Sequence, residues 1–64
     1  MLRRVIVNQA SDTSVSLTGV LWQSRGAWIT LKDVSLLKAG TPPMPMDGEV
    51  LIHREQIAFM QVLP

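Results

Sequence analysis

The chain has 64 residues, no cysteine and one histidine, so disulfides are excluded and neither a metal site nor a cofactor is expected. Six Lys and Arg against five Asp and Glu give a net charge of +1, which does not predict nucleic-acid binding by charge alone. At this length the chain holds one domain, which we expect to cover residues 1–64.

The beginning of the chain predicts a strand followed by a turn. Residues 2–10 start as a strand in which Val5 and Val7 share one face. Residues 11–14 form a polar cluster of the kind found in turns. We therefore expect a short first strand that leads directly into the longest patterned stretch of the chain.

The stretch from residue 15 to residue 37 predicts a long, bent β-hairpin. Apolar and polar residues alternate on both sides of Ser24-Arg25-Gly26, with the period of a strand that buries one face. Gly26 tolerates the positive φ that such a turn needs. Gly19 lies inside a strand and predicts a bend, a bulge or a close backbone approach. A further bulge is expected at residues 33–35, because the alternation ends there in two consecutive leucines.

Residues 39–47 form the one clear loop, which is rich in proline and methionine. Its three prolines remove backbone donors and stiffen the chain. Met44 and Met46 alternate with these prolines, and two interpretations stay open. The loop is either a protruding arm whose methionines enter a groove of a neighbouring chain, or a segment folded back over the end of the barrel with the methionines as plugs.

Two more strands and a short corner are expected after the loop. Residues 49–53 form the fourth strand, and residues 54–56 are a polar corner suited to one 3₁₀ turn. Residues 57–63 form the fifth strand, with Ile57 and Phe59 on one face. Both faces are apolar, which predicts burial on both sides. The last strand of a small barrel is also a natural edge for pairing with another subunit.

Four stretches along the chain together resemble a known family. They are Val5-Ile6-Val7, Leu17-Thr18-Gly19-Val20-Leu21, Ile29-Thr30-Leu31-Lys32-Asp33-Val34 and Gly48-Glu49-Val50-Leu51-Ile52-His53-Arg54-Glu55-Gln56-Ile57. Their order is similar to that of the Sm-like family, which has the SH3-like barrel topology. The resemblance implies an all-β fold, a five-stranded and strongly bent small barrel without substantial helix. It also implies assembly by pairing of strand four of one subunit with strand five of the next.

The sequence departs from the Sm-like pattern at the residues that carry RNA binding. Family members bind bases through an aspartate and an asparagine between strands two and three, and residues 23–28 contain neither. The arginine–glycine pair of the second family motif is replaced by His53-Arg54. The RNA-binding function of the family therefore does not carry over residue by residue.

The composition predicts partner chains. Hydrophobic residues make up 47% of the chain and charged residues only 17%, and a lone small barrel would expose much of that apolar surface. We therefore predict a non-catalytic structural or assembly module that forms a homo-oligomer or docks on a partner protein. The chain also resembles small actinobacterial phage proteins, which implies a virion component, on the capsid or at the head–tail or tail region. The expected interface anchors are large and apolar: Trp22, Trp28, Met44, Met46, Phe59 and Met60.

Two other functions are kept as alternatives. A ring that binds single-stranded RNA or DNA would use Arg25, His53 and Arg54, with the two tryptophans as stacking platforms. Tryptophans serve more often as core or interface anchors, and His53 fits an exposed strand-end residue better than a phosphate contact. A regulatory adaptor would instead capture a peptide at the edge of the fifth strand or through the proline loop.

Catalysis and membrane insertion are not expected. The five acidic residues are scattered, and neither a second histidine nor a cysteine is available to build a nucleophilic site. No stretch reaches the roughly 20 apolar residues of a membrane helix, and no signal peptide is visible. We therefore expect a protein made in the cytoplasm, which the phage resemblance would place in a virion.

Overall fold

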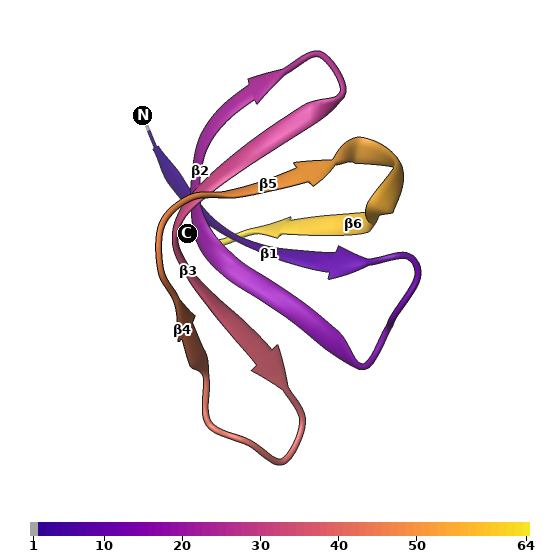
Figure 1. The fold of residues 1–64 in the computed structure, drawn as a ribbon, viewed down its shortest axis with the longest axis vertical. Coiled ribbons are helices and arrows are strands. Elements are labelled where there is room, and N and C mark those ends of the chain that lie inside the picture. Colours follow the sequence, from indigo (N-terminus) through magenta and orange to yellow (C-terminus); the bar gives the residue numbers. More distant parts are fainter. Residues whose placement is uncertain (1) are drawn as a thin grey trace.

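Six β-strands make up the computed structural model, which describes residues 2–64 (Figure 1). In chain order they are β1 (Arg3–Gln9), β2 (Val15–Arg25), β3 (Trp28–Lys38), β4 (Met44–Met46), β5 (Val50–His53) and β6 (Ile57–Val62), with one 3₁₀ turn, η1 (Arg54–Gln56), before β6. The described residues contain no α-helix, so the predicted all-β fold is confirmed. None of their helical turns has the length and apolar character needed to cross a membrane.

The strands form one antiparallel sheet that bends back on itself without closing. Its order is β4-β3-β2-β1-β6, and β5 pairs with the first half of β3 while β4 pairs with the second half. Within residues 2–64, β5 pairs only with β3 and β6 only with β1, so each keeps one unpaired edge. The sheet is therefore open, and the barrel that the sequence predicts is not confirmed.

The prediction of five strands is wrong by one, because part of the Pro/Met-rich loop is a strand. Residues 44–46 pair with residues 34–36 of β3. A proline is tolerated at Pro45 because β4 lies at the edge of the sheet, where one side of the strand needs no ladder. The predicted loop over residues 39–47 thus begins as a turn and then becomes the outermost strand.

Gly19 and Asp33 produce the bend in the central hairpin. The β2–β3 register slips by one residue at this point, which confirms the predicted bulge. A Cβ added to Gly19 would lie 2.9 Å from the carbonyl oxygen of Lys32, so the two backbones approach more closely than a side chain allows. Asp33 takes the left-handed conformation, with φ of 52°. The predicted close approach at Gly19 is therefore confirmed as well.

The tip of the hairpin is a two-residue turn at Gly26 and Ala27. It lies slightly later than the predicted Ser24-Arg25-Gly26, because Arg25 and Trp28 still pair as the last residues of β2 and the first of β3. Gly26 has φ of 58° while Ala27 keeps a negative φ, as in a type II′ turn.

The buried core is small for the number of apolar residues. Among the residues that the structure describes, seven hydrophobic side chains are buried, namely Val5, Val7, Leu17, Ile29, Leu31, Val34 and Ile52. Eight large apolar side chains are exposed among residues 2–64: Leu2, Trp22, Trp28, Met44, Met46, Leu51, Phe59 and Val62. Where such side chains lie together, they mark binding surfaces.

Strand β6 is not buried on both sides, which corrects the sequence prediction. None of its residues is fully buried, and Phe59 is 60% exposed. A register shift opposite residues 8 and 9 separates Ile57 from Phe59, so the two do not share a face. Ile57 and Met60 pack against the core, whereas Phe59 points outward opposite Asn8. The apolar character of both faces therefore does not come from burial within residues 2–64, where β6 lies at an open edge of the sheet.

Candidate functional site

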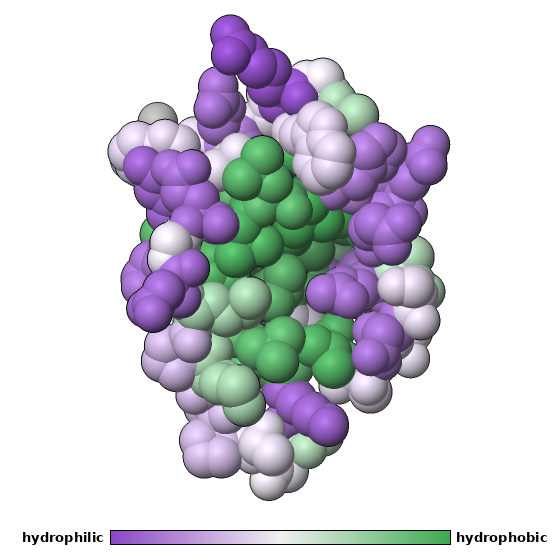
Figure 2. Space-filling view, viewed as in Figure 1, coloured by the Kyte–Doolittle hydropathy of each residue, from purple (hydrophilic) through white to green (hydrophobic). Residues whose placement is uncertain are grey.

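An apolar groove of about 460 Å³ opens beside β5. Figure 2 shows apolar side chains down the middle of this face of the molecule, with polar side chains around them. The lining residues include no Lys, Arg, Asp or Glu. We call this surface the β5 groove, and its lining residues are Gln9, Leu17, Trp28, Leu36, Met46, Val50, Leu51, Ile52, His53 and Gln56.

The β5 groove follows the unpaired edge of β5. Side chains alternate along this strand: Ile52 is buried beside the core, whereas Leu51 points outward and is 58% exposed. Residues of both orientations line the groove, from Val50 to His53. The other edge of β5 is occupied by β3. A single cavity lined by side chains from both faces of β5 must therefore pass around the free edge of the strand, so this edge borders the groove.

The backbone of β5 directs hydrogen-bonding groups into the groove at Leu51 and His53. The N–H of Arg54 donates to the carbonyl oxygen of Ala27 at 2.8 Å, which places the backbone groups of Arg54 on the β3 side. In an antiparallel ladder, neighbouring residues direct these groups to opposite sides. Ile52 therefore bonds to β3, and the N–H and C=O groups of Leu51 and His53 face away from it.

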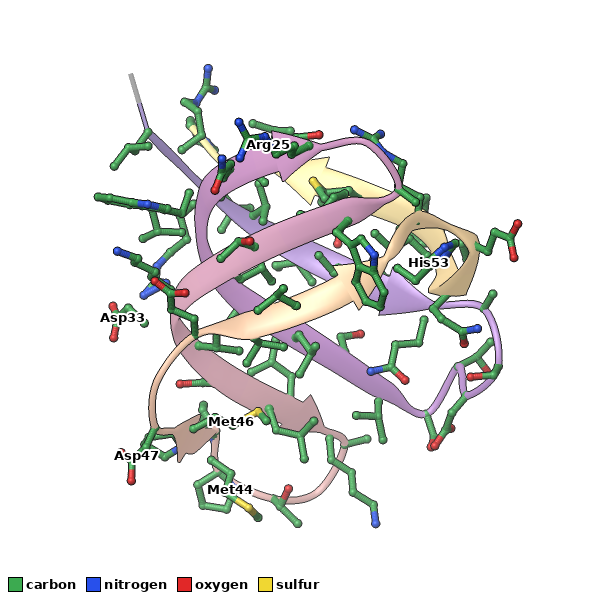
Figure 3. The ribbon with its side chains drawn as sticks, turned by 45° about the horizontal axis from the view of Figure 1, so that its top comes forward. Arg25, Asp33, Met44, Met46, Asp47 and His53 are labelled. Atoms are coloured by element: carbon green, nitrogen blue, oxygen red, sulfur yellow. The ribbon has the colours of Figure 1, made fainter. Side chains whose placement is uncertain are left out.

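Met46 and Leu36 form the wall of the groove at the other end of β5. Met46 lies opposite Val34 and therefore on the core side of the sheet, yet it is 40% exposed. Met44 lies further out on the same strand (Figure 3) and does not line the groove. Residues 44–46 are paired to β3, but Met44 is 57% and Met46 40% exposed, so the methionines do not act as plugs within residues 2–64, and insertion into a neighbouring chain stays a prediction.

Trp28 and His53 bound the groove near the hairpin tip. They are partners in the β3–β5 ladder, and their rings meet edge to face. His53 also caps η1, because its Nδ1 accepts the N–H of Glu55 at 3.2 Å. The imidazole is thus held in place on both sides. His53 ends β5 as the sequence predicts, but it is half-buried rather than exposed.

Arg54 holds the tip of the central hairpin. Its Nε donates to the carbonyl oxygen of Gly26 at 2.6 Å, and its Nη2 donates to the hydroxyl of Ser24. Arg25 lies in the same tip as the partner of Trp28. The structure therefore gathers Arg25, His53 and Arg54, the predicted nucleic-acid residues, at one end, but the guanidinium of Arg54 is already engaged within the chain.

Trp22 lies apart from this group. It occupies an irregular step in the β2–β3 register, and the ammonium of Lys32 sits 3.5 Å from the centre of its ring. Lys32 in turn forms an ion pair with Glu49 at 3.3 Å. The two tryptophans therefore contact different partners, and the cation beside Trp22 is neutralised by a carboxylate.

The predicted interface anchors do not form one surface. Trp28 and Met46 line the groove, whereas Phe59 and Met60 lie on β6 and do not. Leu51 lines the groove but is not among the predicted interface anchors. The alternation of side chains along the strand places it on the face opposite Val50 and Ile52. An exposed apolar residue on a strand that also has a buried face is the signal that could have identified it.

Comparison with models of known protein families, with curated proteins and with solved structures found no match.

Proposed function

We propose that this protein is a non-catalytic assembly module that docks on another polypeptide through the β5 groove. The observation that carries the proposal is the unpaired backbone edge of β5 inside an uncharged, apolar groove. An extended segment laid along this edge would satisfy the outward backbone groups of Leu51 and His53. Such strand addition gains affinity from main-chain hydrogen bonds and specificity from alternate side chains.

The shape of the groove defines the segment that fits. One row of its side chains would contact Trp28 and Leu51 on the outer side, and the other row would contact Leu36 and Met46. A segment with apolar residues in both rows is therefore expected, without charges where it passes the groove. Proline is excluded where the peptide must donate an N–H to β5.

Selection from a random-peptide display library tests this function without a known partner. We expect uncharged, apolar peptides to be enriched and to bind with micromolar dissociation constants. In a Trp22→Phe background, Trp28 is the only tryptophan and reports binding by fluorescence. N-methylation of alternate peptide residues should weaken binding at least tenfold, because it removes the donors of the ladder.

Two variants separate groove binding from general stickiness. Leu51→Lys introduces a charge at the rim of the groove and should abolish peptide binding. Phe59→Lys introduces the same charge at an equally exposed position on β6 and should leave binding unchanged. A library that yields no enriched peptide, or peptides that bind Leu51→Lys as tightly as the natural chain, would contradict the proposal.

The virion setting and the nucleic-acid alternative stay predictions. The engaged guanidinium of Arg54 and the ion pair of Lys32 with Glu49 favour the protein partner over the nucleic acid. Titration with single-stranded oligonucleotides at several salt concentrations tests the alternative, because phosphate contacts weaken as salt rises. A salt-dependent change in fluorescence that Arg25→Ala abolishes would favour the ring over the protein-binding module.

A further inference from the structure

Strand β6 presents a second unpaired edge, which does not line the β5 groove. From Ile57 to Leu63 the chain has no charged residue and no proline. Natural proteins usually protect an edge with such residues, as Pro45 does at β4. Phe59 and Val62 are exposed on opposite sides of the strand, at 60% and 53%. The edge is thus open to another strand and apolar on both faces.

The backbone bonds of β6 show which residues face this edge. The N–H of Leu63 donates to the carbonyl oxygen of Arg4 at 2.9 Å, so the backbone groups of Leu63 point toward β1. Because neighbouring residues of a strand alternate, Gln61 also bonds to β1, and Met60 and Val62 direct their N–H and C=O groups to the open edge. The side chains of Met60 and Val62 lie opposite Val7 and Val5, on the core side of the sheet.

We propose that β6 pairs antiparallel with β6 of a second copy of this chain, across a two-fold axis at Gln61. In this register Met60 lies opposite Val62 of the second copy, so that the residues with free backbone groups bond to each other. Phe59 then lies opposite Leu63 of the second copy on the outer face. Because the strand is uncharged, an isologous contact brings no like charges together.

Pairing of β6 with β5 of a second copy is less suitable. The residues of β5 that face its open edge are Leu51 and His53, whose side chains point outward, whereas those of β6 are Met60 and Val62, whose side chains point inward. Residues that are directly opposite in an antiparallel pair project from the same face of the sheet. Pairing β5 with β6 in this way would therefore join the outer face of one copy to the inner face of the other, which β6–β6 pairing avoids.

The proposal goes beyond the docking function, because it uses β6 and leaves the β5 groove of each copy free. The dimer would present two grooves, so a partner with repeated segments could bind both at once. Loss of dimerisation and loss of groove binding are separate results, since the first is measured on the chain alone and the second with a peptide.

Cysteine cross-linking tests the two-fold axis directly, because the natural chain has no cysteine. Residues opposite each other in a non-hydrogen-bonded pair have Cα atoms about 4.5 Å apart, within the range of a disulfide. In the presence of oxidised glutathione, Gln61→Cys should form a covalent dimer. The two thiols lose two protons and two electrons as the disulfide forms, and oxidised glutathione takes them up. Phe59→Cys should not form such a dimer, because residue 59 lies opposite residue 63.

Sedimentation equilibrium of the natural chain supplies the second readout. We expect a mass of twice 7.1 kDa at micromolar concentration. Val62→Pro should be monomeric but folded, because it removes an N–H that only the second copy uses. Gln61→Pro removes an N–H bonded to β1 and should lose the fold, as shown by circular dichroism.

Two results would overturn the two-fold pairing. One is a natural chain that sediments as a monomer at several hundred micromolar. The other is a disulfide between Leu51→Cys and Val62→Cys chains in a mixture, because these residues lie opposite each other only if β5 pairs with β6, whereas β6–β6 pairing places Val62 opposite Met60.

Discussion

The rings of Trp28 and His53 meet at nearly a right angle, with an interplanar angle of 85° and centroids 5.1 Å apart. The same imidazole accepts the backbone N–H of Glu55 and so fixes the start of η1. His53 therefore connects the wall of the β5 groove to the corner that leads into β6. His53 thus lies at the point where β5, with one open edge, leads through η1 into β6, with the other.

Replacing His53 separates its two roles. His53→Ala removes both the ring contact and the cap, and should lower the free energy of unfolding by about 1–2 kcal/mol. His53→Asn keeps a side-chain acceptor for the N–H of Glu55, so its free energy of unfolding should fall by only about half as much. Urea unfolding followed by circular dichroism measures both variants. Equal losses in the two variants would show that the cap contributes nothing.

Arg54 is expected to stabilise the hairpin tip, whatever else it contacts. Arg54→Lys keeps the charge but loses the planar group that reaches Gly26 and Ser24 together, so unfolding should become easier by about 1 kcal/mol. Arg25→Lys, at the same tip, should change stability by less than about 0.5 kcal/mol, as expected for an exposed position. The prediction fails if the two substitutions cost the same in thermal unfolding.

The sequence predicts most of the strands well, because the alternation and the glycines that indicate them are local features of the chain. The alternation over residues 15–37 predicts the central hairpin, and Gly19 predicts the close approach to Lys32. The sequence predicts a loop at β4, because Pro45 and the two prolines just before the strand are typical of loops. Only pairing with residues 34–36 of β3, which no local pattern shows, turns residues 44–46 into a strand.

The candidate groove was harder to predict, because it is defined by what the sheet leaves uncovered. Trp28 and Met46 were expected to be interface residues, and both line the groove. Leu17 and Gln9 join them from distant strands, which no spacing in the sequence indicates. A regular strand would place Phe59 on the face of Ile57, and the irregular β1–β6 register moves it to the opposite face.

The close approach at the bend makes Gly19 the glycine whose substitution should destabilise the fold most. Gly19→Ala places a methyl group against the Lys32 carbonyl and the Val34 side chain, and should destabilise the fold by about 2–3 kcal/mol. Gly26→Ala meets no neighbouring atom, and only its φ of 58° is unfavourable, so a loss of about 1 kcal/mol is expected. Thermal unfolding of both variants checks the order. A larger effect at Gly26 would contradict the close approach at Gly19.

The turn between β1 and β2 should make stability depend on acid pH through Asp12. The Ser14 hydroxyl, at 2.6 Å, and then the Ser14 N–H, at 3.0 Å, donate to this carboxylate and hold the pKa of Asp12 below its ordinary value of 3.8. Because the folded chain binds this proton less readily, the stabilisation is present above pH 3.8 and is lost as the pH falls through the lower, folded pKa. Ser14→Ala should raise the pKa of Asp12 in a carboxyl NMR titration, and its stability deficit at pH 6 should shrink in acid. Ser11→Ala, in the same turn, is the matched control. If the loss of stability in Ser14→Ala does not change with pH, the hydrogen bonds to Asp12 do not make stability depend on pH.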